Sequence, residues 1–200
     1  MAITINGTGT ITGVSVGGLP DGIVDTDMLA SGAITSAGLP AGTVLQVQSA
    51  VKTDTATVTA GSTLTNISGL TVNITPASTS NKILIICTLS TTGSGTYAGR
   101  HLALRRDSTS ICVGDAAGNR NRASVAHQQY LGHSGDGWGP DNCGITFLDS
   151  PSTTSEITYG VAYADTSGSS TLWINRPETA TDTSEFNRCA SSIIVMEIAG

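Results

Sequence analysis

Apolar and polar residues alternate with a period of two along many short segments of this chain. The segment that carries Ile157, Tyr159, Val161 and Tyr163 places these large side chains on one side and small residues between them. Such alternation is typical of a half-buried antiparallel strand. About ten strands of this kind in residues 43–200, with no helical pattern of ten residues among them, predict an all-β antiparallel sandwich, jelly-roll-like, and argue against βαβ folds.

The expected strands share either this alternation or a short apolar run. They are 44–50, 70–74, 82–87, 100–106, 110–113, 124–130, 144–148, 157–163, 171–176 and 192–198. Two of them, 82–87 and 192–198, are apolar on both faces, which predicts central strands. Turn-forming residues at 107–109 and at 165–168 predict two hairpins.

The first 50 residues differ in composition from the rest of the chain. They contain no Lys, no Arg and no aromatic residue, whereas all eight aromatic residues follow residue 96. A stretch so rich in Gly, Thr and Ser cannot bury enough apolar surface to offset ~1–2 kcal/mol of backbone entropy per ordered residue. We therefore expect residues 1–42 to form an extended arm that another chain, or other copies of this one, hold in place. Residues 43–200 are expected to form the β-sandwich domain.

The charge balance excludes several classes of partner. Nine basic and fifteen acidic residues give a net charge of -6, and nucleic-acid binding needs a Lys/Arg-rich surface, so we expect no nucleic-acid partner. The longest apolar run, Ile83–Cys87, is far shorter than the ~20 residues that span a bilayer, so we expect no membrane insertion. The N-terminus lacks a secretion signal pattern, and the four cysteines are therefore expected to be reduced.

Motifs that suggest chemistry are weak in this chain. Gly13–Gly17 matches the G-x-S-x-G pattern of a hydrolase nucleophile, but that pattern requires a strand before it and a helix after it, and Pro20 follows closely. His101, His127 and His133 lack the spacing of metal ligands. We expect no catalytic residues, no metal and no cofactor.

One loop stands out as a candidate binding element. Residues 131–142 are rich in Gly and polar residues and contain one large aromatic side chain, Trp138. A loop Trp can stack on a sugar ring or anchor a partner, and Asp136, Asp141 and Asn142 would then supply hydrogen bonds. The alternative is that Trp138 covers the open end of the sandwich or packs at a contact between subunits.

Several segments together resemble a known family. They are Val44–Val47, Gly69–Ile85, Leu104–Thr109, Phe147–Pro151 and Val195–Ile198, together with the N-terminal Met1–Gly7. These segments are similar to a domain of marine bacteriophage (cyanophage-like) tail-fibre and virion appendage proteins. The block from Leu70 to Ile85 is the most specific part, and the loop around Trp138 is not part of the resemblance.

The resemblance implies a trimeric, β-rich appendage without enzymatic activity. We expect a phage virion structural protein, a tail fibre or receptor-binding appendage, which assembles in the host cytoplasm and becomes part of the particle. Residues 1–42 would bind other virion proteins, and the domain would attach to a host surface glycan or receptor as a homotrimer. The alternatives are a head fibre or capsid decoration protein and, third, a glycan-degrading tailspike, against which the chain length and the scattered carboxylates argue.

Overall fold

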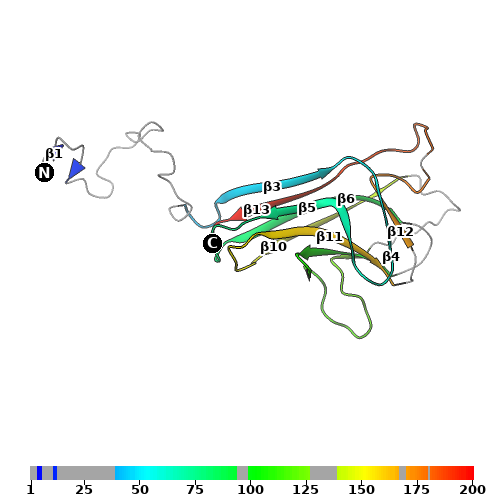
Figure 1. Cartoon of the computed structure of the whole chain (residues 1–200), viewed down its shortest axis with the longest axis horizontal. Helices are drawn as coiled ribbons and strands as arrows, with labels where there is room; N and C mark the ends of the chain where they lie inside the picture. The colour runs from blue at the N-terminus through cyan, green and yellow to red at the C-terminus, as the bar shows by residue number, and fades with distance from the viewer. Residues whose placement is uncertain are drawn as a thin grey trace. The chain divides into compact units, whose positions relative to one another are not determined.

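The computed structural model divides the chain into two compact units, Met1–Leu39 and Pro40–Gly200 (Figure 1). It describes residues 4–5, 11–12, 39–93, 99–126, 139–166, 170–179 and 181–200. In the first unit, β1 (Thr4–Ile5) pairs with β2 (Ile11–Thr12) in antiparallel orientation. The expected anchoring role of residues 1–42 falls mostly outside the described residues.

Two antiparallel sheets build the second unit. The first sheet consists of β3 (Val44–Lys52), β4 (Ala56–Ala60), β6 (Lys82–Gly93), β10 (Asp141–Asp149), β12 (Ser170–Ile174) and β13 (Ser191–Ile198). Its order is β3-β13-β6-β12-β4, and β10 also pairs with β6. The 12-residue strand β6 is central, as its apolar run predicts, because it pairs with β10 on one side and with β13 and β12 on the other.

The first sheet is four strands wide, although six strands contribute to it. Strands β13 and β12 pair with successive parts of β6, residues 82–88 and 91–93. Strands β3 and β4 then pair with β13 and β12 in the same order. Strands β3 and β4 thus form one long strand that is interrupted at residues 53–55. Strands β12 and β13 form a second long strand, which is interrupted at residues 175–190.

The second sheet has the same width. It consists of β5 (Thr65–Ile74), β7 (Arg100–Arg106), β8 (Thr109–Ile111), β9 (Val125–Ala126) and β11 (Ile157–Asp165), in the order β5-β11-β7-β8. Strand β9 also pairs with β7, next to β8, and residues 112–124 between them leave the sheet as an excursion. In Figure 1 this excursion projects from the rest of the domain.

The hydrophobic core lies between the two sheets. Its fully buried side chains come from both of them, and the largest are Tyr159, Tyr163, Ile67, Leu70, Ile83, Ile85, Leu89, Leu102, Leu104, Ile157, Leu172 and Ile174. The expectation of an antiparallel β-sandwich is therefore confirmed. The described residues contain no helix, and accordingly none that could span a membrane.

Two expectations about connections have different outcomes. Asp107 and Ser108 do close a hairpin between β7 and β8, with Asp107 at a φ of 52°. The hairpin expected at residues 165–168 is wrong, because β11 belongs to the second sheet and β12 to the first. Turn-forming residues of the same types occur both in a hairpin and in a connection that crosses from one sheet to the other. Local composition therefore does not distinguish the two kinds of connection. Strand β4 was not expected, since Val58 is its one large apolar residue.

Candidate functional site

The second unit has two distinct ends. At one end, Gly42 N donates to the Ala199 carbonyl at 2.8 Å and Ala199 N donates to the Thr43 carbonyl at 2.9 Å, so the start of the unit and the last residues of the chain lie together (Figure 1). Strand β6 begins at this end, and its 12 residues at ~3.3 Å each span about 40 Å. Asp141, which pairs with Thr91 near the end of β6, therefore lies at the opposite end.

The predicted binding loop is described only in part. Trp138 and Asp136 lie outside the described residues, whereas Asp141 and Asn142 are the exposed first residues of β10. Asn142 Oδ1 accepts a hydrogen bond from Ser90 Oγ of β6, so this oxygen helps to hold the strand pair. The structure thus places Asp141 and Asn142 at the end away from Pro40, and ligand binding by the loop stays a prediction.

A buried carboxylate joins the two sheets. Asp149, at the end of β10, forms an ion pair with Arg106 of β7, whose Nη1 lies 3.1 and 3.0 Å from the two carboxylate oxygens. The Tyr159 hydroxyl of β11 donates to the same carboxylate at 2.7 Å. Burial raises the pKa of Tyr159, and its hydrogen bond to Asp149 raises it further. Because the phenol stays protonated and donates to a paired carboxylate, this group stabilises the sandwich.

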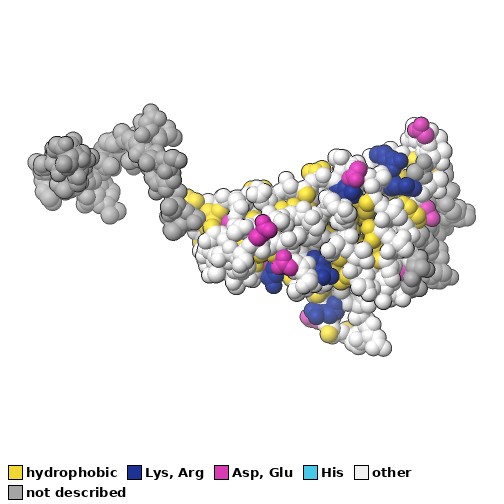
Figure 2. All heavy atoms as spheres, viewed as in Figure 1, with side chains coloured by type: hydrophobic (Ala, Val, Ile, Leu, Met, Phe, Trp, Pro, Cys, Tyr) yellow, Lys and Arg dark blue, Asp and Glu magenta, His cyan; other side chains and the backbone are white. Residues whose placement is uncertain are grey.

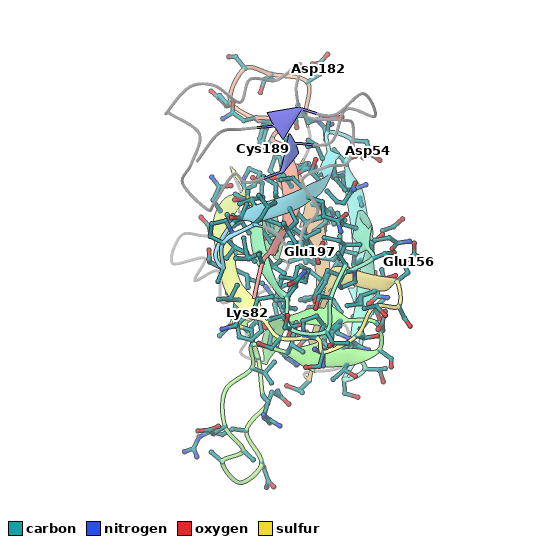
Figure 3. All side chains as sticks on the ribbon, turned by 90° about the vertical axis from the view of Figure 1, so that its left-hand side faces the viewer. Asp54, Lys82, Glu156, Asp182, Cys189 and Glu197 are labelled. Atoms are coloured by element: carbon teal, nitrogen blue, oxygen red, sulfur yellow. The ribbon has the colours of Figure 1, made fainter. Side chains whose placement is uncertain are left out.

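A second buried carboxylate, Glu197, lies near the C-terminus on β13, which pairs with β6 on the side away from β10. Glu197 of β13, labelled in Figure 3, is fully buried and accepts three hydrogen bonds of 2.6 Å, from Gln46 Nε2, Ala77 N and Asn81 Nδ2. Burial by itself raises the pKa of Glu197, but the bonds from Asn81, Gln46 and Ala77 outweigh this effect and hold the pKa below its usual value. The carboxylate therefore fixes the 75–81 loop against β3 and β13.

Most residues of these two groups come from the segments on which the expected resemblance rests. Arg106 belongs to one such segment and Asp149 to another, and the structure brings them together as an ion pair. Glu197 and its partner Asn81 likewise come from two different segments. These residues therefore stabilise the fold by joining separate strands and loops. The sequence did not reveal these pairings, because each carboxylate appears there only as a single Asp or Glu in an otherwise apolar strand.

A third polar centre holds the interruptions of the first sheet together. Asn175, fully buried at a φ of 60°, donates from Nδ2 to the carbonyls of Lys52 at 2.7 Å and Asp54 at 2.9 Å. Its Oδ1 accepts from Ser191 Oγ at 2.6 Å, and its N–H donates to the Ser90 carbonyl at 2.8 Å. Asn tolerates this left-handed backbone better than most residues. One side chain thus aligns both long strands across their interruptions.

The histidines and cysteines are the remaining candidates for chemistry. Residues 39–93, 99–126, 139–166, 170–179 and 181–200 hold no group of three His, Cys, Asp or Glu that could bind a metal ion. His101 Nδ1 lies 3.1 Å from the Gly99 carbonyl, while His127 and His133 lie outside the described residues. The four cysteines are free thiols. Burial raises the pKa of Cys87 to about 12, so this thiol stays protonated at neutral pH and is a poor nucleophile.

The outer face of the first sheet is apolar. Met196 of β13 lies opposite Val47 of β3 and Leu84 of β6, and Leu148 of β10 lies opposite Leu84, which forms one row across the sheet. Val47 is 52% exposed and Leu148 is 47% exposed. Figure 2 shows hydrophobic side chains along the edge of the domain where β3 lies. The two strands that read as apolar on both faces therefore have one face in the core and one face open.

No protein-family model and no curated protein matches this chain. The functional conclusion therefore rests on the resemblance in the sequence and on the geometry described above.

Proposed function

We propose that this protein is a non-enzymatic structural protein of a phage virion, a tail fibre or receptor-binding appendage. Residues 1–42 bind other virion proteins, and the domain is presented to the host surface as part of a homotrimer. The observation that carries the proposal is the division of the chain into an N-terminal unit poor in core-forming residues and a compact β-sandwich. Such a division suits a particle-bound anchor with a solvent-facing domain.

The strand order supports a jelly roll as the finer description of the domain. When β3 with β4, β12 with β13 and β8 with β9 are each counted as one strand, the domain has two sheets of four strands. Consecutive strands alternate between the sheets except at the β7–β8 hairpin. Jelly rolls have eight strands in two sheets and occur in viral capsid and lectin domains.

The polar centres support a structural role. Asp149, Glu197 and Asn175 are buried polar residues with several hydrogen-bond partners each, and each of them joins separate strands. A glycoside hydrolase typically needs two carboxylates that face the substrate. Here the buried carboxylates of Asp149 and Glu197 are engaged by donors from the chain itself.

Host attachment by the end away from Pro40 is the remaining part of the proposal. Asp141 and Asn142 lie at this end, and Trp138 precedes them in the sequence by a few residues. A weak site of this kind gains strength when three copies bind the same surface together. The expected ligand is a host surface glycan or receptor.

Localisation on purified particles tests this proposal. Antibodies against residues 43–200 should label the tails of intact phage particles, and a chain that lacks residues 1–42 should fold but fail to join the particle. Labelling of the head would favour the alternative, a head fibre or capsid decoration protein. Absence of the chain from particles, or incorporation without residues 1–42, would contradict the proposal.

A further inference from the structure

We propose that the outer face of the first sheet is the surface through which copies of this chain associate. The surface, here the outer apolar face, consists of Val44, Val47, Val51, Leu84, Ile86, Leu148, Ile194, Met196 and Ile198. The inference deepens the homotrimer of the proposed function by naming its interface, and it does not depend on where in a virion the protein resides.

The strand registers place these side chains next to one another. The first row is Val47, Met196, Leu84 and Leu148, with one residue from each of four adjacent strands. In the second row, Ile194 lies opposite Ile86, and Ser49 and Thr146 flank them. Directly opposite side chains in a sheet lie about 5 Å apart, so the apolar residues form one continuous patch.

All the members of the outer apolar face are exposed or half-buried in the single chain. Val44, Val47, Val51 and Leu148 are the exposed large hydrophobic residues of the described part of the chain, and every one of them lies on this sheet. Their concentration on one face is informative because scattered single apolar residues are normal on surfaces, whereas contiguous patches mark interaction sites.

The charge distribution favours a second copy of the same chain as the occupant. The chain carries a net charge of -6, so two copies repel each other over most of their surfaces. Among the outward positions of β3, β13, β6 and β10, all of them described, Lys82 alone is charged. When three such uncharged faces turn toward a common three-fold axis, no acidic residues of these strands are brought together.

The size of the face sets the expected strength. Four strands at ~4.8 Å spacing and about eight residues at ~3.3 Å give a face of roughly 400–500 Å². A stable interface buries about 800 Å² on each partner. The face alone is smaller than such an interface, so we expect an association that is lost on dilution.

The test introduces charge at two exposed positions of the face in the full chain. The variant carries Val47→Glu and Leu148→Glu, at side chains already about half in contact with water. The control is Gln48→Glu, which adds one of the two negative charges to β3 on its other face. Sedimentation velocity over a range of concentrations measures association, and circular dichroism with thermal melting checks that the domain is folded.

We expect wild type and Gln48→Glu to associate equally, and the double variant to require about 100-fold higher concentration or more, since uncompensated like charge in an interface costs several kcal/mol. Equal association of all three chains would overturn the proposal while leaving the homotrimer intact. A wild type that stays monomeric would overturn both.

Oxidation of Met196 by peroxide provides a second readout that needs no substitution. In wild type, Met196 should oxidise several-fold more slowly at high protein concentration than under dilution to the monomer. A Met196 that is protected in a monomer would mean that another segment of the same chain covers the face. A rate that does not depend on concentration would likewise overturn the proposal.

Discussion

The two sheets of the sandwich contribute similar apolar inner faces to one core, but their outer faces differ in character. On the outer face of the second sheet, Thr158 Oγ1 donates to Asn73 Oδ1 at 2.9 Å, and the small residues Gly160 and Ala162 of β11 are already buried within the chain. On the first sheet, the equivalent layer is the row that contains Met196 and Leu84. Small residues that the chain itself buries need no further cover, whereas an exposed apolar face of four strands gains free energy when it is covered. The comparison leaves the first sheet as the one whose outer face a partner would cover.

The largest expected loss of stability is at Asp149, whose carboxylate joins the two sheets. Asp149→Ala should lower the free energy of unfolding by about 3–5 kcal/mol, because Arg106 and the Tyr159 hydroxyl would lose their buried partner. Urea unfolding followed by circular dichroism measures the change. Asp115→Ala, at an exposed carboxylate of the 112–124 excursion, is the control and should stay within about 0.5 kcal/mol of wild type. Equal effects of both substitutions would show that the ion pair does not hold the sheets together.

Glu197→Gln should lower the stability by about 1–3 kcal/mol, because the amide group cannot accept all three hydrogen bonds as the carboxylate does. The effect should depend on pH. The folded-state pKa of Glu197 lies below its usual value of 4.5, so the ionised form stabilises the protein above that pH, and this contribution is lost as the pH falls through the folded-state pKa.

Melting temperatures of wild type and Glu197→Gln between pH 7 and pH 3 measure this dependence. The difference between the two proteins should be largest near neutral pH and should shrink below pH about 4.5. A difference that grows on acidification would contradict the assigned direction of the pKa shift.

A pair of glycines probes the two outer faces directly. A Cβ atom at Gly160 of the second sheet would lie 2.9 Å from Thr71 Cγ2 and 3.3 Å from the Leu70 carbonyl oxygen, whereas a Cβ at Gly144 of the first sheet meets nothing closer than 3.8 Å. Gly160→Ala should therefore cost about 1–2 kcal/mol, and Gly144→Ala should be neutral or slightly stabilising. Thermal melting of the two variants decides the matter, and the reverse order of stability would show that the faces pack differently.

The smallest effect is expected at the 112–124 excursion. Ser124 anchors its base, since Ser124 Oγ accepts from Leu104 N at 2.9 Å and Ser124 N donates to the Leu102 carbonyl. Replacement of residues 114–122 by a short Gly-Ser linker that keeps Ser124 should change the free energy of unfolding by less than about 1 kcal/mol. Urea unfolding measures this, and a large loss would mean that the excursion belongs to the folded core.

Much of the fold could be predicted from the sequence because alternation reports burial directly. The strand around Tyr159 and Tyr163 and the central position of 82–87 both follow from the pattern of apolar residues. The crossing at residues 165–168 could not be predicted, since the choice between a hairpin and a change of sheet depends on distant pairing partners. The apolar outer residues of β6 and β13 were recognised, but which of their faces is open depends on which sheet covers them.

The candidate site was less accessible to sequence reasoning. The Trp138 loop attracted attention by its composition, and the structure adds only the positions of Asp141 and Asn142. The outer apolar face is built from four strands that are far apart in the sequence, and only their register brings Val47, Met196 and Leu148 into one row. No local motif carries that information.

The solution mass of the full chain tests the central claim most directly. The claim is that the outer apolar face is covered by other copies of the chain. Sedimentation equilibrium at micromolar concentration should give a mass near three times 20.2 kDa, with dissociation on dilution. A mass of 20.2 kDa that does not change with concentration would contradict the account.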